Sequence, residues 1–474
     1  MNNNIINLLN IEDTDVIITD IIIEGNTKKI YIEKVLKPEY CPNCSSRMYS
    51  KGKYPRIINH PILQDGYKLI LIVSQRKWKC TNPQCKLYFN DQFNFISSYK
   101  QSSNIVPYMI LNEMKNINVT TSDVAARYNV SDTTVHYIFM QYLDIQRLPL
   151  PEILSIDEVH MDMDYKHNYI LVLMDFTSGD IVDLLPNRWE ETTNAYFMSI
   201  PEEERRKVKY LICDMYNPYI NYTKRYFPNS IAIIDSFHVI SWLLHFIIIY
   251  INSLKKEFQN RDRKKFKEKL IRENKPHDDI YINDNLPVSR EVYLLTHYRW
   301  LILQNKDSID YRTERKYSRK FKMYLNTYDY EKMFFDIDES LIKIRNLKEK
   351  YIEFNSTKEK NKDKVSDALS ELIDEYSKSE FNFIKTFAET LRKHKQEIIN
   401  SFTYITDDKG KKRRLSNGPI EGFNRIPKDF KRNCRGVTNF EYVRTRLIWS
   451  RRKNEPILTT PKSKTEVYKY KNKK

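Results

Sequence analysis

The sequence predicts an α/β protein built on a mixed sheet with helices on its faces, interrupted by a large helical insertion. Two observations predict this class. Between residues 153 and 235, β-branched, strand-like runs alternate with polar or helix-like segments, first as two hairpin-linked strands and then as a β-α-β alternation. From about 240 to 405 the apolar spacing becomes helical and glycine is almost absent, which predicts an insertion made of helices.

The length and charge of the chain indicate the broad class of protein. A chain of 474 residues predicts about three domains, and 41% hydrophobic with 30% charged residues is typical of a soluble globular protein. The formal net charge is +17, which favours a polyanion, most often nucleic acid, as the partner. The alternative is that a chain rich in Lys, Asn, Ile and Tyr is basic through its composition alone.

The sequence carries no signal for export and no convincing membrane span. Its N-terminus has neither a basic n-region nor a cleavage-like site, so it does not read as a signal peptide. The apolar run WLLHFIIIYI at 242–251 contains a His and is too short to cross a bilayer. Six cysteines in a long chain without an export signal argue against a disulfide framework. We therefore expect a cytoplasmic protein without a membrane partner.

Four cysteines of the N-terminal module, residues 1–99, form two close pairs. The motif CPNC holds Cys41 and Cys44, and CTNPQC, after 35 intervening residues, holds Cys80 and Cys85. Two thiolate pairs can close a tetrahedral zinc shell, and four protein ligands leave no open position, so this zinc would be structural. The alternative is four ordinary buried cysteines, but paired spacing that occurs twice favours a zinc ribbon.

Residues 100–149 predict an all-α helix-turn-helix domain. In TTSDVAARYNVSDTTVHYIFMQYL (120–143), Ser122 or Thr121 can cap a first helix, and YNVS makes a short turn. Asp132 or Ser131 can cap a second helix, whose outward N-terminal part is where a recognition helix meets base edges. The alternative is a small helical hairpin without a DNA-binding role. The candidate DNA-binding residues are Thr133, Thr134, His136 and Tyr137.

Three acidic residues accompany the apolar runs of the predicted sheet. Asp157 lies in LSIDEVHMD, and Asp214 and Asp235 end the runs VKYLICD and SIAIIDSFH. A carboxylate at the end of a buried strand is costly unless it is paired or binds a metal. The alternative for each is a cap on the following helix. Several such acids in one sheet favour a divalent-metal site, in which two Mg²⁺ ions roughly 3.5–4 Å apart would serve phosphodiester chemistry.

Five blocks of the sequence carry a family resemblance. They are the cysteine ribbon, the helix-turn-helix, SIDEVH, LICDMYNPYINYTKRYFPNSIAIIDSFHVI and SNGPIEGFNRIPKDFKRNCRGVTNFEYVRTRLIW, and they cover most of residues 41–450. The last two are the most specific, because they contain the spaced elements Asp-Met-x-x-x-Tyr, Asp-x-Phe-His and Asn-Gly-x-x-Glu-Gly-x-Asn-Arg. In these blocks the chain resembles the DDE transposases of the bacterial ISL-three (ISL3) insertion-sequence family.

The resemblance implies an RNase H-like catalytic domain at 150–450, with the helical insertion at about 240–405 placed before the last catalytic acid. It implies a DDE triad of Asp157, Asp214 and Glu421, which would hold two Mg²⁺ (or Mn²⁺) ions. Asp235 and His238 match the Asp-x-Phe-His element and are expected to be accessory residues near the site.

The resemblance also implies a reaction and partners. The reaction is cleavage at the terminal inverted repeats of a mobile element, followed by strand transfer into target DNA. The zinc ribbon and helix-turn-helix would recognise the element ends. Two ends must be brought together, so we expect a homodimer on double-stranded DNA, associated with the nucleoid in the cytoplasm.

The tract around Glu421 is strongly basic. Nine Lys or Arg and only two acids lie between residues 411 and 435. At helical spacing one stripe is apolar and can dock on the sheet: Ile420, Phe423, Pro427 and Phe430. An adjacent stripe offers cations for DNA phosphates: Arg425, Lys428 and Arg432. Pro427 is expected to kink this helix, and the alternative role of Glu421 is helix capping. The polar, basic segment 451–474 is expected to be a disordered tail.

Two other functions fit parts of the same pattern. A non-catalytic, transposase-derived regulator would need only the zinc ribbon and the helix-turn-helix. A metal-dependent nuclease would cleave DNA without strand transfer. The complete set of three acids favours the transposase over both.

Overall fold

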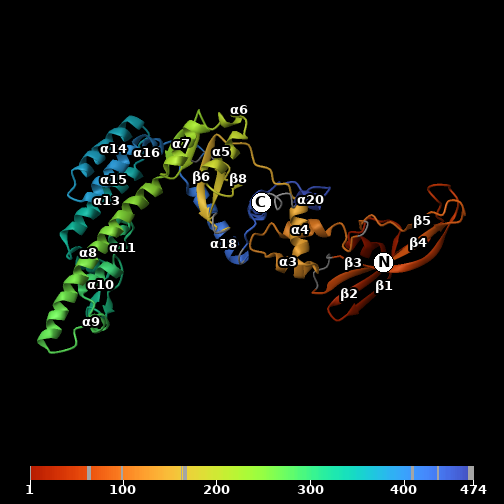
Figure 1. Cartoon of the computed structure of the whole chain (residues 1–474), viewed down its shortest axis with the longest axis horizontal. Coiled ribbons are helices and arrows are strands. Elements are labelled where there is room, and N and C mark those ends of the chain that lie inside the picture. The colour runs from red at the N-terminus through yellow and green to blue at the C-terminus, as the bar shows by residue number, and fades with distance from the viewer. Residues whose placement is uncertain are drawn as a thin grey trace.

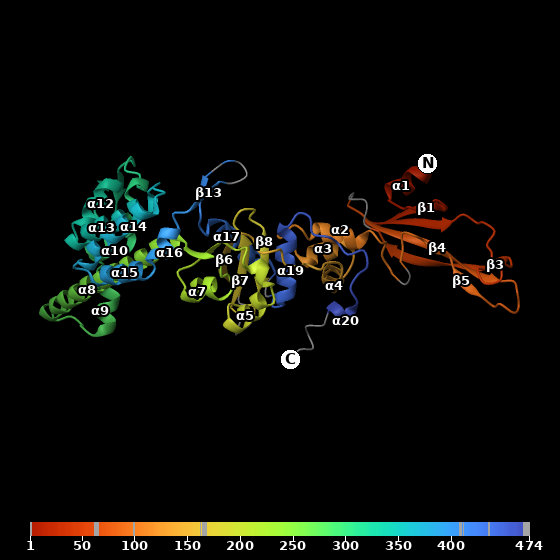
Figure 2. The ribbon, with the colours of Figure 1, turned by 90° about the horizontal axis from the view of Figure 1, so that it is seen from above.

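The computed structural model describes residues 2–60, 66–97, 100–161, 163, 168–406, 410, 412–434 and 437–467. The molecule is elongated and arched: the N-terminal strands lie at one end, a second sheet lies in the middle, and a helical arm lies at the other end (Figure 1). Seen from above, the short helices that follow the N-terminal strands lie between that module and the central sheet (Figure 2).

The N-terminal module is a five-stranded sheet with a short helix packed on its first strand. The strand order is β1-β2-β4-β3, with β5 paired to β4, and all pairs are antiparallel except β2 with β4. Its main core gathers buried residues such as Ile32, Leu71 and Val73, away from the cysteines. The elements are α1 (Asn2–Leu8), β1 (Val16–Glu24), β2 (Thr27–Lys34), β3 (Met48–Asn59), β4 (Lys68–Cys80) and β5 (Tyr88–Asn90).

Three short helices form the next unit: α2 (Val106–Glu113), α3 (Thr121–Tyr128) and α4 (Asp132–Tyr142). Thr120, not Ser122 or Thr121, caps α3, because its extended backbone lets its hydroxyl accept from the Asp123 amide in a capping box. Asn129 ends α3 in the left-handed conformation (φ 52°), and Ser131 caps α4. The predicted pair of helices joined by a short turn is present.

The central sheet has the mixed arrangement that the sequence predicts. Its strand order is β10-β9-β6-β7-β8. Within this sheet, β7 pairs antiparallel with both β6 and β8. After helical crossovers, β9 pairs parallel with β6, and β10 pairs parallel with β9. Apolar cores cover both faces of this sheet. The elements are β6 (Ile153–His160), β7 (Tyr169–Asp175), β8 (Ile181–Leu185), α5 (Glu190–Met198), α6 (Glu202–Arg205), β9 (Tyr210–Cys213), α7 (Asn217–Arg225) and β10 (Ile231–Ile234).

The insertion after β10 is helical, as expected, and it also carries a small hairpin. It forms the arm of Figure 1 around its own apolar core. The elements are α8 (Ser236–Arg272), α9 (Asp279–Asn285), α10 (Arg290–His297), α11 (Trp300–Leu303), η1 (Lys306–Ser308), β11 (Lys316–Ser318), β12 (Met323–Leu325), α12 (Thr327–Phe335), α13 (Glu339–Ser356), α14 (Lys362–Ser377), α15 (Asn382–Lys393) and α16 (Lys395–Asn400).

Helix α8 is longer than the apolar run that marks it in the sequence. Over 37 residues it contains an 18-residue window of mean hydropathy 1.7, of which 28% is buried, so its length and composition alone would suffice to cross a membrane. The run 242–251 is itself too short to cross a bilayer, but the helix that contains it is long and apolar enough by this criterion. Its residues Leu243, Ile247 and Ile251 are buried in the apolar core of the insertion.

After the insertion the chain returns to the sheet through a second hairpin and three helices. Ile420, Phe423, Pro427 and Phe430 are all buried, as the predicted apolar stripe requires. The helix is interrupted at Asn424, so that Pro427 lies in the first turn of a new helix, where its missing N–H costs little. The elements are β13 (Tyr404–Thr406), β14 (Lys412–Arg414), α17 (Gly418–Phe423), α18 (Arg425–Cys434) and α19 (Phe440–Arg451).

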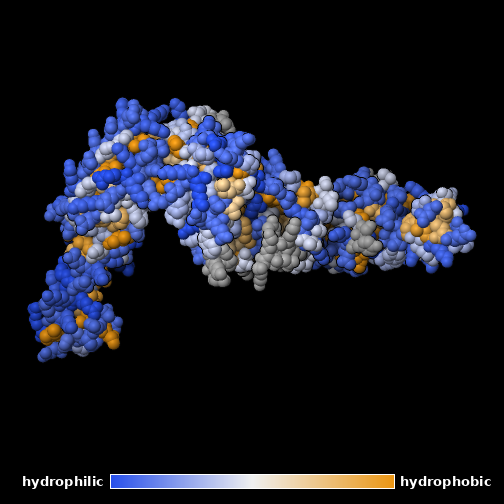
Figure 3. Space-filling model, turned by 45° about the horizontal axis from the view of Figure 1, so that its top comes forward, coloured by the Kyte–Doolittle hydropathy of each residue, from blue (hydrophilic) through white to orange (hydrophobic). Residues whose placement is uncertain are grey.

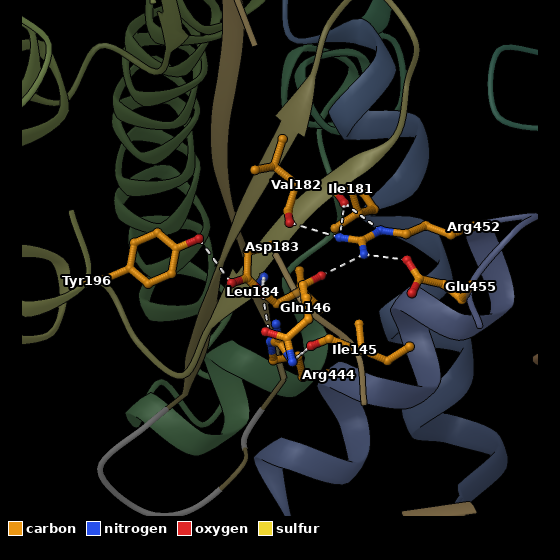
Figure 4. A network of polar contacts seen from close by, with 10 residues as sticks. All are labelled: Ile145, Gln146, Ile181, Val182, Asp183, Leu184, Tyr196, Arg444, Arg452 and Glu455. Atoms are coloured by element: carbon orange, nitrogen blue, oxygen red, sulfur yellow. Dashed lines mark hydrogen bonds and ion pairs between the residues drawn. The ribbon is translucent and has the colours of Figure 1, made fainter. Parts of the chain in front are cut away.

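Arginines at the C-terminal end cover the open edge of strand β8 (Figure 4). Arg452 donates to the carbonyl oxygens of Ile181 and Val182 at 2.8–2.9 Å. Arg444 of α19 donates to the Asp183 carboxylate at 2.6 Å. These bonds satisfy acceptors that an edge strand otherwise leaves exposed. They also fix the segment that follows Glu421 to the side of the sheet opposite β10.

The segment 451–467 is ordered, contrary to the expected disorder of 451–474. The backbone amides of Leu458 and Lys462 donate to carbonyl oxygens of α4 at 2.9 Å, and α20 (Lys464–Val467) packs on the same helix. Composition suggested disorder, but tertiary contacts with α4 supply the partners that this polar segment lacks locally. Residues 468–474 lie outside the described part of the chain.

Candidate metal centre and nucleic-acid interface

Strand β6 presents two adjacent carboxylates to opposite sides. Asp157 is buried and accepts hydrogen bonds from the backbone amide of Glu158 at 2.7 Å and from the side chain of Asn424 at 2.6 Å. Glu158 instead pairs with Arg188 and accepts from Tyr219 at 3.0 Å. The alternation of strand side chains therefore leaves Asp157 as the acid of this pair that faces the helix bearing Glu421.

Asp214 directly follows β9 and is not a helix cap. Helix α7 begins after Tyr216 without a side-chain cap. The Asp214 carboxylate lies 2.8 Å from the ring nitrogen Nε2 of His238 and 3.2 Å from the side-chain nitrogen of Asn417. Its alternative role as a cap is excluded by this geometry, and it points toward side chains from α8 and α17.

Asp235, which directly follows β10, is the N-terminal cap of α8. It is buried and caps α8, with one carboxylate oxygen accepting from the Phe237 amide at 3.1 Å. The other oxygen accepts from the backbone amide of Asn417 at 2.9 Å. Both oxygens thus hold backbone groups, so Asp235 ties the start of α17 to the end of the sheet.

Two buried asparagines flank Glu421 and tie its helix to the sheet acids. Asn417, four residues before Glu421, contacts Asp214, and Asn424, three residues after it, contacts Asp157. In each of these amides the oxygen Oδ1 has no hydrogen-bond partner within the described chain. Both asparagines belong to the sequence pattern Asn-Gly-x-x-Glu-Gly-x-Asn-Arg. Their hydrogen-bond partners are distant in the chain, so local spacing could not predict them.

Glu421 completes a compact group of ligand-type side chains. Its carboxylate lies 3.7 Å from His238 Nε2, and the side chain is 37% exposed. One ligand atom each from Asp235, His238 and Glu421 lies within 4.8 Å of the others. Asp214 joins this group through His238. Asp157 is linked to the same group by its hydrogen bond from Asn424, which follows the helix that bears Glu421. The structure therefore brings the three predicted acids and the two predicted accessory residues to one end of the sheet.

Burial and neighbouring charges shift the pKa values of three side chains in this group. Burial, followed by the charge of Asp214, raises the pKa of Asp157 to about 7. Burial and then Asp235 raise the pKa of Glu421. Burial lowers the pKa of His238, but the hydrogen bond and charge of Asp214 outweigh it and raise the pKa to about 9. Such mutually perturbed groups are typical of functional sites.

The donor set fits a divalent cation. Carboxylate oxygens are the ligands that Mg²⁺ prefers. Burial and neighbouring carboxylates raise the pKa values of Asp157 and Glu421 despite the cations nearby, His238 and, for Glu421, Arg425, and the two buried amide oxygens lack donors within the described chain. A bound cation would relieve both deficits, because it neutralises the acids and orders water toward the amide oxygens.

The four cysteines of the N-terminal module come together as their spacing predicts. Cys41 and Cys85 have their Sγ atoms 3.5 Å apart, as do Cys44 and Cys80, and all four lie within 4.8 Å of one another. A tetrahedron of sulfurs about 2.3 Å from zinc has edges of about 3.8 Å. The geometry therefore fits a structural Cys₄ zinc site, and a small core with Met48 and Trp78 surrounds it.

The candidate DNA-binding residues of α4 are in different environments. Thr133 is exposed, and Thr134 takes part in the cap of its own helix. His136 stacks on Tyr442 of α19 with ring centroids 4.6 Å apart, and Tyr137 lies under a lysine of α20. His136 and Tyr137 are half-buried, because α19 and the C-terminal segment contact that side of α4, and the DNA-binding role of all four residues stays a prediction.

The predicted cationic stripe beside Glu421 is at the surface. Arg425, Lys428 and Arg432 are all exposed on α18, and Arg432 pairs with Asp429 at 3.1 Å. Since α17 and α18 both pack on β6, these cations lie on the same side of the sheet as Glu421.

A second cationic face lies on the cysteine-bearing strands of the N-terminal module and was not singled out from the sequence. Residues 40–90 contain nine Lys or Arg and one acid, Asp65. Lys51, Lys77 and Lys79 surround the exposed ring of Tyr88 at 5.3–5.4 Å. The signal was present as a run nearly free of acids, but only strand pairing shows that these side chains share a face opposite the buried Trp78.

The central mixed sheet therefore carries a cluster of acidic side chains at one end, and cationic surfaces lie on α18 and on the cysteine-bearing strands. This combination is typical of enzymes that act on nucleic acid. The sequence model of the ISL3-type DDE transposases, a family described as transposase, matches residues 154–447. This match covers more than half of the chain, which therefore belongs to that transposase family, and the resemblance drawn from its motifs is confirmed.

One curated relative supports the same assignment. Over 295 residues the chain is 22% identical to the transposase for insertion sequence element IS1001 of Bordetella parapertussis. The aligned region is 60% of this chain and 64% of the relative, so the chain spans less than two thirds of the length of that protein.

Proposed function

We propose that the protein is a DNA transposase that binds the terminal inverted repeats of an insertion sequence and catalyses metal-dependent DNA cleavage and strand transfer. The observation that carries this proposal is the convergence of Asp157, Asp214 and Glu421, from three distant segments, at one end of the sheet. The sheet, with three antiparallel strands followed by two parallel ones, supports an RNase H-like fold for residues 150–450.

In this proposal the three acids hold two Mg²⁺ or Mn²⁺ ions, which would activate the attacking oxygen and stabilise the leaving oxygen. Asp157 and Asp214 provide carboxylates fixed to the sheet, and Glu421 provides one fixed to α17. Asp235 anchors α17 through its bond to the Asn417 amide. His238 balances the charge of Asp214 and Glu421 from α8.

The DNA would lie along the cationic surfaces. Arg425, Lys428 and Arg432 would contact phosphates beside the cleaved bond, whereas α4, through Thr133 and Thr134, would contact the element end. The zinc-bearing strands would extend this surface through Lys51 and its neighbours. A homodimer would bring two ends together, in keeping with a nucleoid-associated, cytoplasmic protein.

The test is to incubate the purified protein with an element-end duplex, target DNA and Mg²⁺. Strand-transfer product supports the transposase. Cleavage without joining would identify a nuclease, and binding without chemistry would identify a DNA-binding regulator. Each of the last two outcomes overturns the proposal, and the complete acid cluster favours the first.

The asparagine pair gives a prediction about the metal. Asn424→Ala or Asn417→Ala should lower Mn²⁺ affinity by roughly 10–100-fold, because each amide orients a carboxylate in the way that outer-shell partners of metal ligands do. Calorimetric titration of the full chain with Mn²⁺ measures this. Asn433→Ala, an exposed asparagine of α18, is the matched control. Unchanged affinity in both buried-site variants would contradict the assigned role.

A further inference from the structure

The hairpin of the helical insertion has the composition of a nucleic-acid contact surface. From Arg312 to Leu325 the chain contains six Lys or Arg and one acid, Glu314. The two strands β11 and β12 are joined by a turn in which Lys322 adopts the left-handed conformation (φ 54°). Nothing in the chemistry proposed above uses this segment.

One side of the hairpin fixes it to the insertion. Leu325 is buried, and the ring of Phe321 packs edge-on against Tyr293 of α10, with centroids 5.6 Å apart. Lys320 donates to the carbonyl oxygen of Val288 before α10. The hairpin is therefore held in place by the arm, and its outer side chains are presented in a defined direction.

The outer side exposes large rings that a soluble surface normally covers. Tyr317 and Tyr324 are a cross-strand pair, 54% and 67% exposed, with ring centroids 5.3 Å apart. Met323, the neighbouring residue along β12 and therefore on the opposite face, is 50% exposed. Toward the far end of the arm, Figure 3 shows apolar side chains scattered among hydrophilic ones. Scattered apolar side chains are normal on a protein surface, so the feature that singles out the hairpin is the pair of exposed tyrosine rings that pack edge-on across its two strands.

The cations of the same hairpin identify the kind of partner. Lys316, Arg319 and Lys322 are exposed and make no side-chain ion pair or hydrogen bond that the described residues reveal. Arg315, in contrast, is engaged with Asp329 at 3.0 Å. Cations that follow a backbone, next to aromatic faces on which bases stack, are the two parts of a surface for single strands. In a duplex the bases already stack on one another, so exposed rings favour unpaired bases.

We propose that the β11–β12 hairpin binds single-stranded DNA, with Lys316, Arg319 and Lys322 on the phosphates and Tyr317 and Tyr324 stacked on unpaired bases. DNA as the polyanion rests on the proposed function. In this proposal the hairpin holds an unpaired strand, and it acts through binding, not through chemistry.

The test uses fluorescence anisotropy of the full, zinc-loaded chain with a labelled oligothymidylate, in buffer without Mg²⁺. The variant K316A/R319A/K322A should lower affinity roughly 10–100-fold, and the slope of log affinity against log salt should fall by about 2, because each lost single-strand phosphate contact removes about 0.7. Tyr317→Ala with Tyr324→Ala should cost about tenfold or more, and the Phe pair should restore binding, since stacking needs only the ring.

Matched controls separate this role from general charge and from folding. Lys358→Ala with Lys362→Ala and Lys385→Ala removes the same charge from exposed positions elsewhere on the insertion and should leave binding unchanged. An unchanged melting temperature shows that the variants are folded. Equal losses in both triple variants would overturn the proposal, as would a loss seen only with duplex DNA or a change only in self-association.

The result is independent of the transposase reaction. If the wild type binds oligothymidylate through the hairpin but forms no cleavage product with Mg²⁺, the hairpin site stands and the proposed reaction fails. If the wild type cleaves DNA and the hairpin variants bind single strands normally, the reaction stands and the hairpin proposal fails.

Discussion

Asp157→Asn, Asp214→Asn and Glu421→Gln are each expected to reduce cleavage and strand transfer roughly a thousandfold or more, because removing one metal-binding carboxylate sacrifices several kcal/mol of charge stabilisation in the transition state. DNA binding should remain, since each change removes a negative charge near phosphates. The measurement is a gel assay of end cleavage and joining, with binding followed in parallel by anisotropy.

The matched control for the acids is Glu158→Gln. This residue adjoins Asp157 on β6 but lies on the other side, paired with Arg188 and Tyr219, so the reaction should persist. Asp235→Asn should act differently from all of them. Its two oxygens hold the α8 and α17 backbones, so it should lose about 1 kcal/mol or more of stability. Full activity in any of the three acid variants would remove that residue from the proposed triad.

Removal of zinc is the second change with a large expected effect. Structural zinc in small domains contributes on the order of 10–16 kcal/mol of apparent folding free energy. Purified protein should therefore contain one zinc per chain, and Cys80→Ser or a chelator should release it. Mass spectrometry of the intact protein under non-denaturing conditions measures the metal content.

The structure sharpens where unfolding should occur. The cysteines lie with Met48 and Trp78 in a small core, whereas the main core of the module gathers around Ile32 and Leu71. Zinc loss should thus expose the strands near the cysteines to protease first and leave the main core folded longer. Cys434→Ala, at a half-buried position of α18, should keep both zinc and protease resistance. A stable, zinc-free wild type would exclude the zinc site.

Much of the fold follows from local patterns. Strand-like runs with acids at their ends predicted the mixed sheet, and the helical spacing of the insertion predicted the arm. Cysteine spacing predicted the cluster of four. These succeed because period, capping and ligand spacing are properties of short segments, and a short segment retains them in any context.

Other features depend on contacts between distant segments, and local sequence patterns did not predict them. His136 and Tyr137 look outward-facing in the sequence, but contacts with α19 and α20 leave both residues half-buried. The segment after residue 451 looks disordered by composition, but Arg452 satisfies the edge of β8. Asn417 and Asn424 could be assigned a role only from the structure, where each one forms a hydrogen bond to an acid of the sheet.

The sequence alone therefore determined the elements, the cysteine cluster, the identity of the candidate acids and the family. Tertiary structure decided which partners surround each acid. Asp235 and Asp214 look equivalent in sequence, because each ends an apolar strand, but one binds backbone amides on both oxygens and the other faces His238 and Asn417. The physical reason is that a carboxylate's role is set by which donors reach it, and those donors come from residues far away in the chain.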